Sequence, residues 1–137
     1  MANGNYWHTE AEWQRVEEPL LLLDPSLTVF AKQFGFEITK NHKDWPSRSV
    51  AWGQDIHLLI QLYLENPENL TFNLWLCASQ DRDGKRYWKT AMPVQGKVVS
   101  EFYSSFASLL TESKVKLEAW SEADLEFATN IDSIPPN

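Results

Sequence analysis

The residues best suited to recognition chemistry lie in two neighbouring stretches, 56–65 and 70–78, in which apolar and polar residues alternate. Aromatic side chains on the mixed face of these stretches offer large contact area at small entropy cost, and the polar ones offer directional hydrogen bonds. We therefore expect either a binding surface or, if another segment covers this face, buried and hydrogen-bonded polar groups. The candidate binding residues there are His57, Gln61, Tyr63, Asn73 and Trp75.

Signals for catalysis are weaker. His57 follows Asp55 by two residues, so on a strand the two side chains share a face, as a general base and its orienting carboxylate would. The sequence places no nucleophile beside them. His8 and Glu12, four residues apart, could reach one metal ion, but no second pair of ligands accompanies them. Because the five glycines are scattered singly, no phosphate-binding loop is present. We expect no catalytic residue, metal or cofactor.

A second candidate site centres on Arg48, in a stretch that also holds Trp45 and Trp52. If this stretch met the predicted second hairpin at one end of the sheet, their cations would form a patch for an acidic protein segment or a phosphate. The alternative is that the tryptophans anchor the stretch to the core, with Arg48 the residue most suited to a further role. The other cations of this patch would be His42, Lys43, Arg82, Lys85, Arg86 and Lys89.

Two helices are predicted ahead of these strands. The stretch from Thr9 to Glu12 has the form of a capping box, and the helix that it begins should end by Pro19, whose ring clashes with the preceding turn. The pair Asp24-Pro25 then suits the cap and first turn of a second helix. Gly35 can close that helix in a left-handed conformation.

The turn at Asp83-Gly84 leaves two strand registers open. A two-residue turn places Trp88 opposite Ser79, whereas a three-residue loop with Gly84 as a bulge places it opposite Ala78, on the core face. We favour the loop, because it buries a large ring and pairs Asp81 with Lys85. The strands before this turn are predicted over residues 36–39, 49–53, 56–64 and 70–78.

The remaining residues favour helix. An amphipathic stripe predicts a helix from residue 98 to 110. Residues 114–120 fit an edge strand or a helix, and we favour helix; Ser121 and Asp124 suggest a short final turn. Runs of helices and runs of strands predict one α+β domain over residues 1–137, an antiparallel meander of about five strands with the N-terminal and C-terminal helices packed on one face. The ends, 1–5 and 131–137, should be flexible.

Composition limits the classes of partner. The chain has 137 residues, is 43% hydrophobic and contains seven tryptophans, enough apolar area for a core without disulfides. Its formal net charge of −7 repels phosphate backbones, so we expect no nucleic-acid partner. The longest aliphatic run, Leu20 to Leu23, is too short to cross a bilayer, and the first residues lack an export signal. With Cys77 as the single cysteine, we expect a cytoplasmic protein without a membrane partner.

In size, acidity and order of predicted elements, the chain resembles bacterial secretion chaperones and small immunity proteins. The resemblance covers gross features of the whole chain and carries over no residue's role. It implies a bacterial accessory protein that works by binding. We therefore expect a non-enzymatic module that binds another protein, or a second copy of itself, through the face of Tyr63 and Trp75. The alternative is a small-ligand binder or an enzyme with a pocket near His57 and Arg48.

Overall fold

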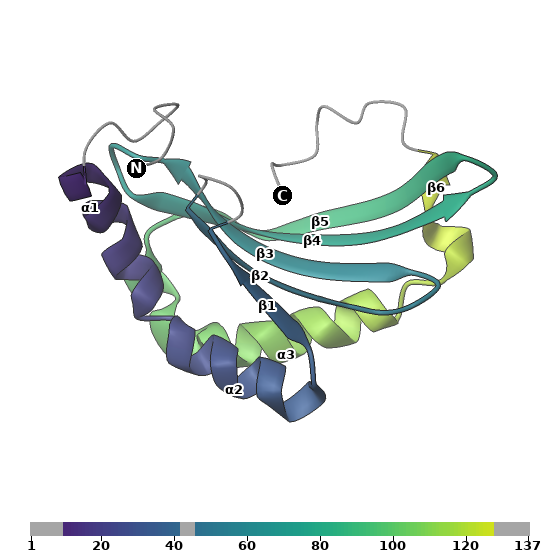
Figure 1. The fold of residues 1–137 in the computed structure, drawn as a ribbon, viewed down its shortest axis with the longest axis horizontal. Coiled ribbons are helices and arrows are strands. Elements are labelled where there is room, and N and C mark those ends of the chain that lie inside the picture. Colours follow the sequence, from purple (N-terminus) through teal and green to yellow (C-terminus); the bar gives the residue numbers. More distant parts are fainter. Residues whose placement is uncertain (1–9, 42–45, 128–137) are drawn as a thin grey trace.

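The computed structural model describes residues 10–41 and 46–127, which form an antiparallel meander sheet with helices (Figure 1). The strands lie in the sheet in sequence order, from β1 to β6. This confirms the predicted α+β class and meander. The elements are α1 (Glu10–Leu21), α2 (Asp24–Phe34), β1 (Glu37–Lys40), β2 (Ser47–Trp52), β3 (His57–Asn66), β4 (Thr71–Arg82), β5 (Lys85–Lys97), the 3-10 turns η1 (Val99–Glu101) and η2 (Tyr103–Ser105), α3 (Phe106–Glu118), the 3-10 turn η3 (Glu122–Asp124) and β6 (Glu126–Phe127).

The core lies between one face of the sheet and the helices. From Leu58 to Leu64 on β3 and from Phe72 to Ala78 on β4, the even-numbered side chains are buried, because residues two apart on a strand point to the same face. They join one hydrophobic cluster with buried residues of all the α-helices, and Figure 1 shows α1, α2 and α3 on one side of the sheet. Burying each large aliphatic or aromatic side chain contributes about 1.5–3 kcal/mol. The strand residues in this cluster include Leu58, Ile60, Leu62, Leu64, Phe72, Leu74, Leu76 and Ala78.

Strand β5 carries two bulges. Between Leu76 and Phe72 the partners on β5 advance from Ala91 through Val94 to Lys97, three residues for every two on β4. Gly96 supplies the left-handed backbone, with φ 57°, that the second bulge uses. Bulges bend a strand, and in Figure 1 the strands bow so that the side away from the helices is concave.

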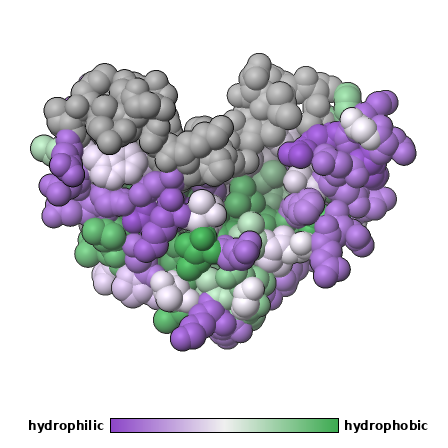
Figure 2. Space-filling view, in the orientation of Figure 1, coloured by the Kyte–Doolittle hydropathy of each residue, from purple (hydrophilic) through white to green (hydrophobic). Residues whose placement is uncertain are grey.

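Both edges of the sheet resist pairing with another strand. The edge strand β1 has only four residues and begins and ends on charged side chains, Glu37 and Lys40. On the other side, β6 pairs with Tyr87 and Trp88 of β5, and further along β5 the edge is interrupted by the bulges and by Pro93, which lacks a backbone donor. Figure 2 shows hydrophobic side chains in the middle of the β1 side, with hydrophilic side chains on both flanks.

The favoured register of the second hairpin is wrong. Arg82 pairs with Lys85 and Trp88 lies opposite Ser79, so the turn has two residues. Asp83 and Gly84 have φ values of 53° and 76°, as a type I′ turn requires. The twist of such a turn matches that of the flanking strands, and this local match decides the register over the burial of one more ring.

The helix boundaries differ from the prediction at α1 and α2. Pro19 lies inside α1, because a proline so near the helix end removes only one backbone hydrogen-bond donor. The helix then ends with hydrogen bonds between residues three apart, such as the one from the Leu23 amide to the Leu20 carbonyl oxygen, 3.0 Å. Asp24 caps nothing; it is the first residue of α2 and its carboxylate binds elsewhere. Gly35 closes α2 with φ 74°, as predicted. Thr9 lies outside the described residues.

After β5 the chain is helical, but α3 begins later than predicted. The turns η1 and η2 occupy the first part of the predicted helix, and α3 then continues through residue 118, which confirms helix over most of 114–120. The turn at Ser121 is also confirmed, with the Asp124 carboxylate accepting from the Ser121 amide at 2.7 Å. The two-residue strand β6 was not predicted, and it brings the sheet to six strands rather than about five.

Two glycines test the backbone argument. At Gly53, where φ is 100°, an added Cβ would overlap the backbone carbonyl oxygen of Ile56, whereas at Gly84, where φ is 76°, it would meet open space. We expect Gly84→Ala to lower the free energy of unfolding by about 1–2 kcal/mol, the cost of a left-handed L-residue. Gly53→Ala should cost clearly more, as measured by urea unfolding. Equal losses in the two variants would contradict this account.

Candidate functional site

The structure brings five of the candidate binding residues onto one face of the sheet. Gln61 lies opposite Trp75 and Tyr63 opposite Asn73, while His57 begins β3 on the same face. Three of them are buried: Gln61 is 1% exposed, Trp75 4% and Asn73 5%. Among these five, only the exposed His57 and the half-buried Tyr63 offer accessible surface.

The buried amide of Asn73 serves the fold. Its oxygen accepts from the Gly96 amide at 2.7 Å, which holds the second bulge of β5 against β4. Its nitrogen donates to the Tyr63 hydroxyl at 3.4 Å. A buried polar group that lost these bonds would cost about 1–3 kcal/mol. On this face, Asn73 therefore supports the bulge.

Arg48 lies on the opposite face of the sheet and is 2% exposed. Its Nε donates to Asp24 Oδ1 at 2.7 Å, and Nη2 lies 3.3 Å from Glu17 Oε2. Its Nη1 donates to Asn41 Oδ1 at 3.0 Å and to the Ser47 carbonyl at 2.9 Å. These contacts connect β2 to α1 and α2, so the guanidinium holds the helices against the sheet.

Asn41 completes this cluster. Its φ of 54° places it in the left-handed region, which asparagine tolerates better than most residues. Its Nδ2 donates to Glu17 Oε2 at 2.9 Å, and its Oδ1 also accepts from the Ser47 amide at 3.2 Å. Lys40 adds a second cation, 3.5 Å from Asp24. Two cations and two carboxylates leave the cluster with no formal net charge.

The residues proposed for a ligand pocket or a cationic patch are not brought together. Arg48 lies opposite Leu62, five residues along β3 from His57 and on the other face. Arg82 is eight residues along β4 from Leu74, the partner of Leu62, roughly 26 Å at strand spacing. The stretch around Arg48 and the second hairpin therefore lie at opposite ends of the sheet. His42, Lys43 and Trp45 are outside the described residues, and Trp52 stacks on Phe36 with ring centroids 4.4 Å apart.

Each cation of the second hairpin has a local partner. Arg82 lies 3.5 Å from Glu122 and stacks on Tyr87, and Arg86 donates to Asp81 at 2.9 Å. That hydrogen bond holds the pKa of Asp81 below its usual value. Two further cations lie over aromatic rings, Lys85 over Phe127 and Lys89 over Trp120.

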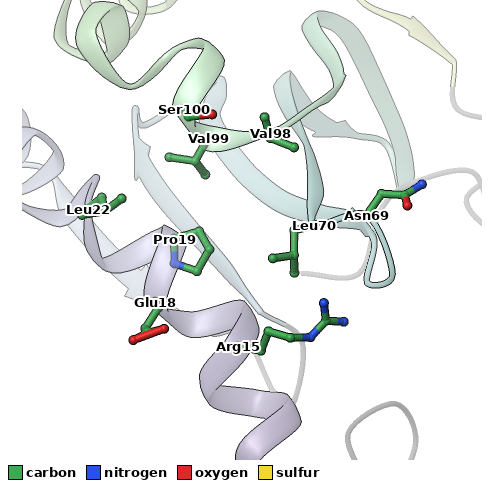
Figure 3. Close-up of a pocket in the computed structure, with 9 residues that line it drawn as sticks. All are labelled: Arg15, Glu18, Pro19, Leu22, Asn69, Leu70, Val98, Val99 and Ser100. Carbon is green, nitrogen blue, oxygen red and sulfur yellow. The ribbon is translucent and has the colours of Figure 1, made fainter.

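One concave site among the described residues was not anticipated from the sequence. A groove with a volume of about 730 Å³ lies between the end of α1, the turn before β4 and η1. Figure 3 shows side chains from all three segments around it. Its apolar lining consists of Pro19, Leu22, Leu70, Val98 and Val99, and its polar lining of Arg15, Glu18, Asn69 and Ser100.

Local backbone geometry forms the walls of this groove. Arg15 donates to the Pro67 carbonyl at 2.6 Å and so ties α1 to the turn between β3 and β4. Asn66 Oδ1 accepts from the amides of Glu68 and Asn69 and so shapes the turn, while Leu70 leaves it with φ 53°. A signal for the groove existed in the leucine run at the end of α1, which one helical stripe cannot bury entirely.

The buried ion pair predicts a large effect for Arg48→Ala. Removing the guanidinium leaves Glu17 without its cation and Asp24 with Lys40 alone, and breaking a buried pair in this way costs about 3 kcal/mol or more. Arg86→Ala is the matched control, because its pair with the exposed Asp81 is screened by water and should contribute little to stability. The measurement is the free energy of unfolding in urea. A loss for Arg48→Ala no larger than that for Arg86→Ala would contradict the structural role of the cluster.

Cys77 should be an unreactive thiol in the folded protein. Burial raises its pKa to about 11, and the nearby charge of Arg86 opposes part of this rise. Iodoacetamide at about pH 8 should therefore modify the native protein far more slowly than the urea-unfolded protein.

Because the native state holds the Cys77 thiol proton more tightly, the free energy of unfolding should fall as pH rises from the pKa of the unfolded thiol, 9.0, towards that of the native thiol, about 11. Cys77→Ala should remove this pH dependence of the free energy of unfolding. Rapid labelling of the native protein by iodoacetamide would contradict the raised pKa of the buried thiol.

The described residues contain no group of three or more His, Cys, Asp and Glu side chains that could hold a metal ion. Within the same residues, no helix has the length and apolar character to span a membrane. Comparisons of the chain with protein-family models, with curated proteins and with solved structures find no match.

Proposed function

We propose that this protein is a non-enzymatic binding module that holds a segment of another protein in the groove between α1, the turn before β4 and η1. The observation that carries the proposal is the apolar lining of an accessible groove beside the exposed Leu22, which is 55% exposed. Exposed apolar surface in a concave site is typical of places where a partner docks.

The composition of the groove favours a peptide segment over a reaction. Its polar residues are Arg15, Glu18, Asn69 and Ser100, and Arg15 already donates to the Pro67 carbonyl. Among the described residues, no histidine or cysteine lines it. The lining therefore offers apolar contact with a few polar groups at the border, the arrangement that an apolar side chain of a partner would fill.

The concave face of the sheet is a weaker candidate surface for the same function. Trp75, Gln61 and Asn73 are buried, so a partner could reach them only after rearrangement, while Tyr63 and His57 remain as contacts. A homodimer through strand pairing is also disfavoured, because both sheet edges carry features that oppose pairing. A heterologous protein partner is accordingly preferred to a second copy.

We further propose a cytoplasmic accessory protein of bacterial type without a nucleic-acid partner. The buried single thiol suits a reducing compartment, and the net charge of −7 opposes phosphate backbones. The ion pairs of the second hairpin also argue against a nucleic-acid partner, because Arg82 and Arg86 already have carboxylate partners.

Site-specific photo-crosslinking tests the proposed surface. A photoreactive amino acid at Leu22 should give a discrete crosslinked species with another protein in cells that produce this chain. The same residue at Val115, which is 64% exposed but lies on α3, is the matched control and should not. Leu22→Ser should then weaken binding of the identified partner at least about tenfold without lowering the thermal midpoint, because it removes apolar contact at the groove alone.

Equal crosslinking from Leu22 and Val115, or none from Leu22, would contradict the groove as the binding surface. A metabolite screen by thermal shift tests the competing class of small-ligand binder. A ligand present at about 100 times its dissociation constant adds roughly 2.7 kcal/mol to stability. A shift of that size that Leu22→Ser abolishes would replace the protein partner by a small molecule.

A further inference from the structure

We infer, resting on the proposed function, that the segment bound in the groove carries apolar side chains flanked by lysine or arginine. The groove supplies the apolar contact, and the surface around it supplies an excess of negative charge. An interaction that combines both would select a basic amphipathic segment over acidic or neutral ones.

A second depression adjoins the groove on α1. It has a volume of about 480 Å³, and the described residues that line it all belong to this helix. It shares Arg15 and Glu18 with the groove, so these two side chains form the border between them. A segment of six to eight extended residues, roughly 20–26 Å long, would reach from the apolar lining across that border. The other residues of the second depression are Ala11, Gln14, Glu17 and Leu21.

Charge complementarity decides the character of that segment. The bordering segments, residues 10–21, 67–70 and 97–101, contain six glutamates, one arginine and one lysine. The formal charge of these segments is therefore negative, and it stays negative when Glu17 is set aside as the partner of Arg48. The glutamates nearest the lining are Glu18, Glu68 beside Asn69, and Glu101 beside Ser100, and all three are exposed.

The two cations do not balance this charge. Arg15 is held by the Pro67 carbonyl, at 2.6 Å, which fixes it on the side of the turn. Lys97 adjoins Val98 at the opposite wall and is the second cation of these segments. Glu18, at the shared border, is therefore the carboxylate best placed to meet a lysine or arginine that follows an apolar side chain seated beside Leu22.

Binding of designed peptides tests this inference directly. Three fluorescein-labelled peptides of identical apolar sequence, flanked by lysine, glutamine or glutamate, are titrated with the full chain and followed by fluorescence anisotropy. The lysine peptide should bind most tightly, the glutamate peptide most weakly, and added salt should reduce the difference, because exposed charges are screened. Glu18→Lys should weaken binding of the lysine peptide about three- to tenfold.

Glu112→Lys is the matched control for Glu18→Lys. It makes the same charge change at an exposed glutamate of α3, away from the groove, and should leave the affinity nearly unchanged. Thermal midpoints of both variants report on folding, and Glu18→Gln supplies a milder change should Glu18→Lys lower the midpoint.

The possible failures separate this inference from the proposed function. If the three peptides bind equally and Leu22→Ser weakens all of them, the groove binds protein segments but the charge inference is wrong. If no peptide binds, or if Leu22→Ser has no effect, the basic amphipathic segment is excluded as the occupant. The crosslink from Leu22 to a cellular partner then decides separately whether the groove is a docking surface.

Discussion

The arrangement of this protein depends on the pairing of one buried cation. A guanidinium removed from water must be matched by carboxylates and hydrogen-bond acceptors, or its burial costs several kcal/mol. Arg48 meets this requirement with Asp24, Glu17, Asn41 and the Ser47 carbonyl. Because these partners come from both N-terminal helices and from the chain leading into β2, the cluster is satisfied in only one relative placement of these elements. The hydrophobic core supplies most of the stability, and the Arg48 cluster specifies how the helices are placed relative to β2.

The second constraint is the bent strand β5. Its bulges let three residues on β5 face two on β4, and Gly96 and Asn73 hold one of them through a bond of 2.7 Å. The bend brings the end of β5 to η1, where Val98 and Val99 form one wall of the groove. The same bulges interrupt the outer edge of the sheet. The two bulges thus help to shape the groove and also protect the edge.

The sequence was sufficient for the elements that depend on periodicity. Alternation from Ile56 to Ala78 predicted the paired strands, and Pro25 and Gly35 predicted where α2 begins and ends. The sequence was insufficient where two local rules competed. At Asp83-Gly84 the turn geometry prevailed over ring burial, and Pro19 was tolerated because so few helical bonds remained after it. A sixth strand of two residues is below the length at which alternation carries information.

The candidate site was harder to predict because it depends on contacts across the chain. The types of residue at Arg48 and Trp75 suggested surface chemistry, but their burial depends on which face of a strand each occupies and on what packs there. Asp24 looked like a helix cap, since no local pattern reveals a partner 24 residues away. The groove joins three segments separated by dozens of residues. Only the leucine run at the end of α1, which exceeds one buried stripe, indicated exposed apolar surface.

The groove and the buried cluster are linked through α1. Arg15 and Glu17 are two residues apart, so their side chains leave the helix in nearly opposite directions. One is tied to the turn before β4 through the Pro67 carbonyl, and the other to β2 through Arg48. The helix is therefore held from both sides, which fixes its rotation and keeps Leu22 on the lining of the groove without a partner present. Because the groove is already formed before binding, association does not include the entropy cost of ordering its walls. A modest apolar contact area is then sufficient for useful affinity.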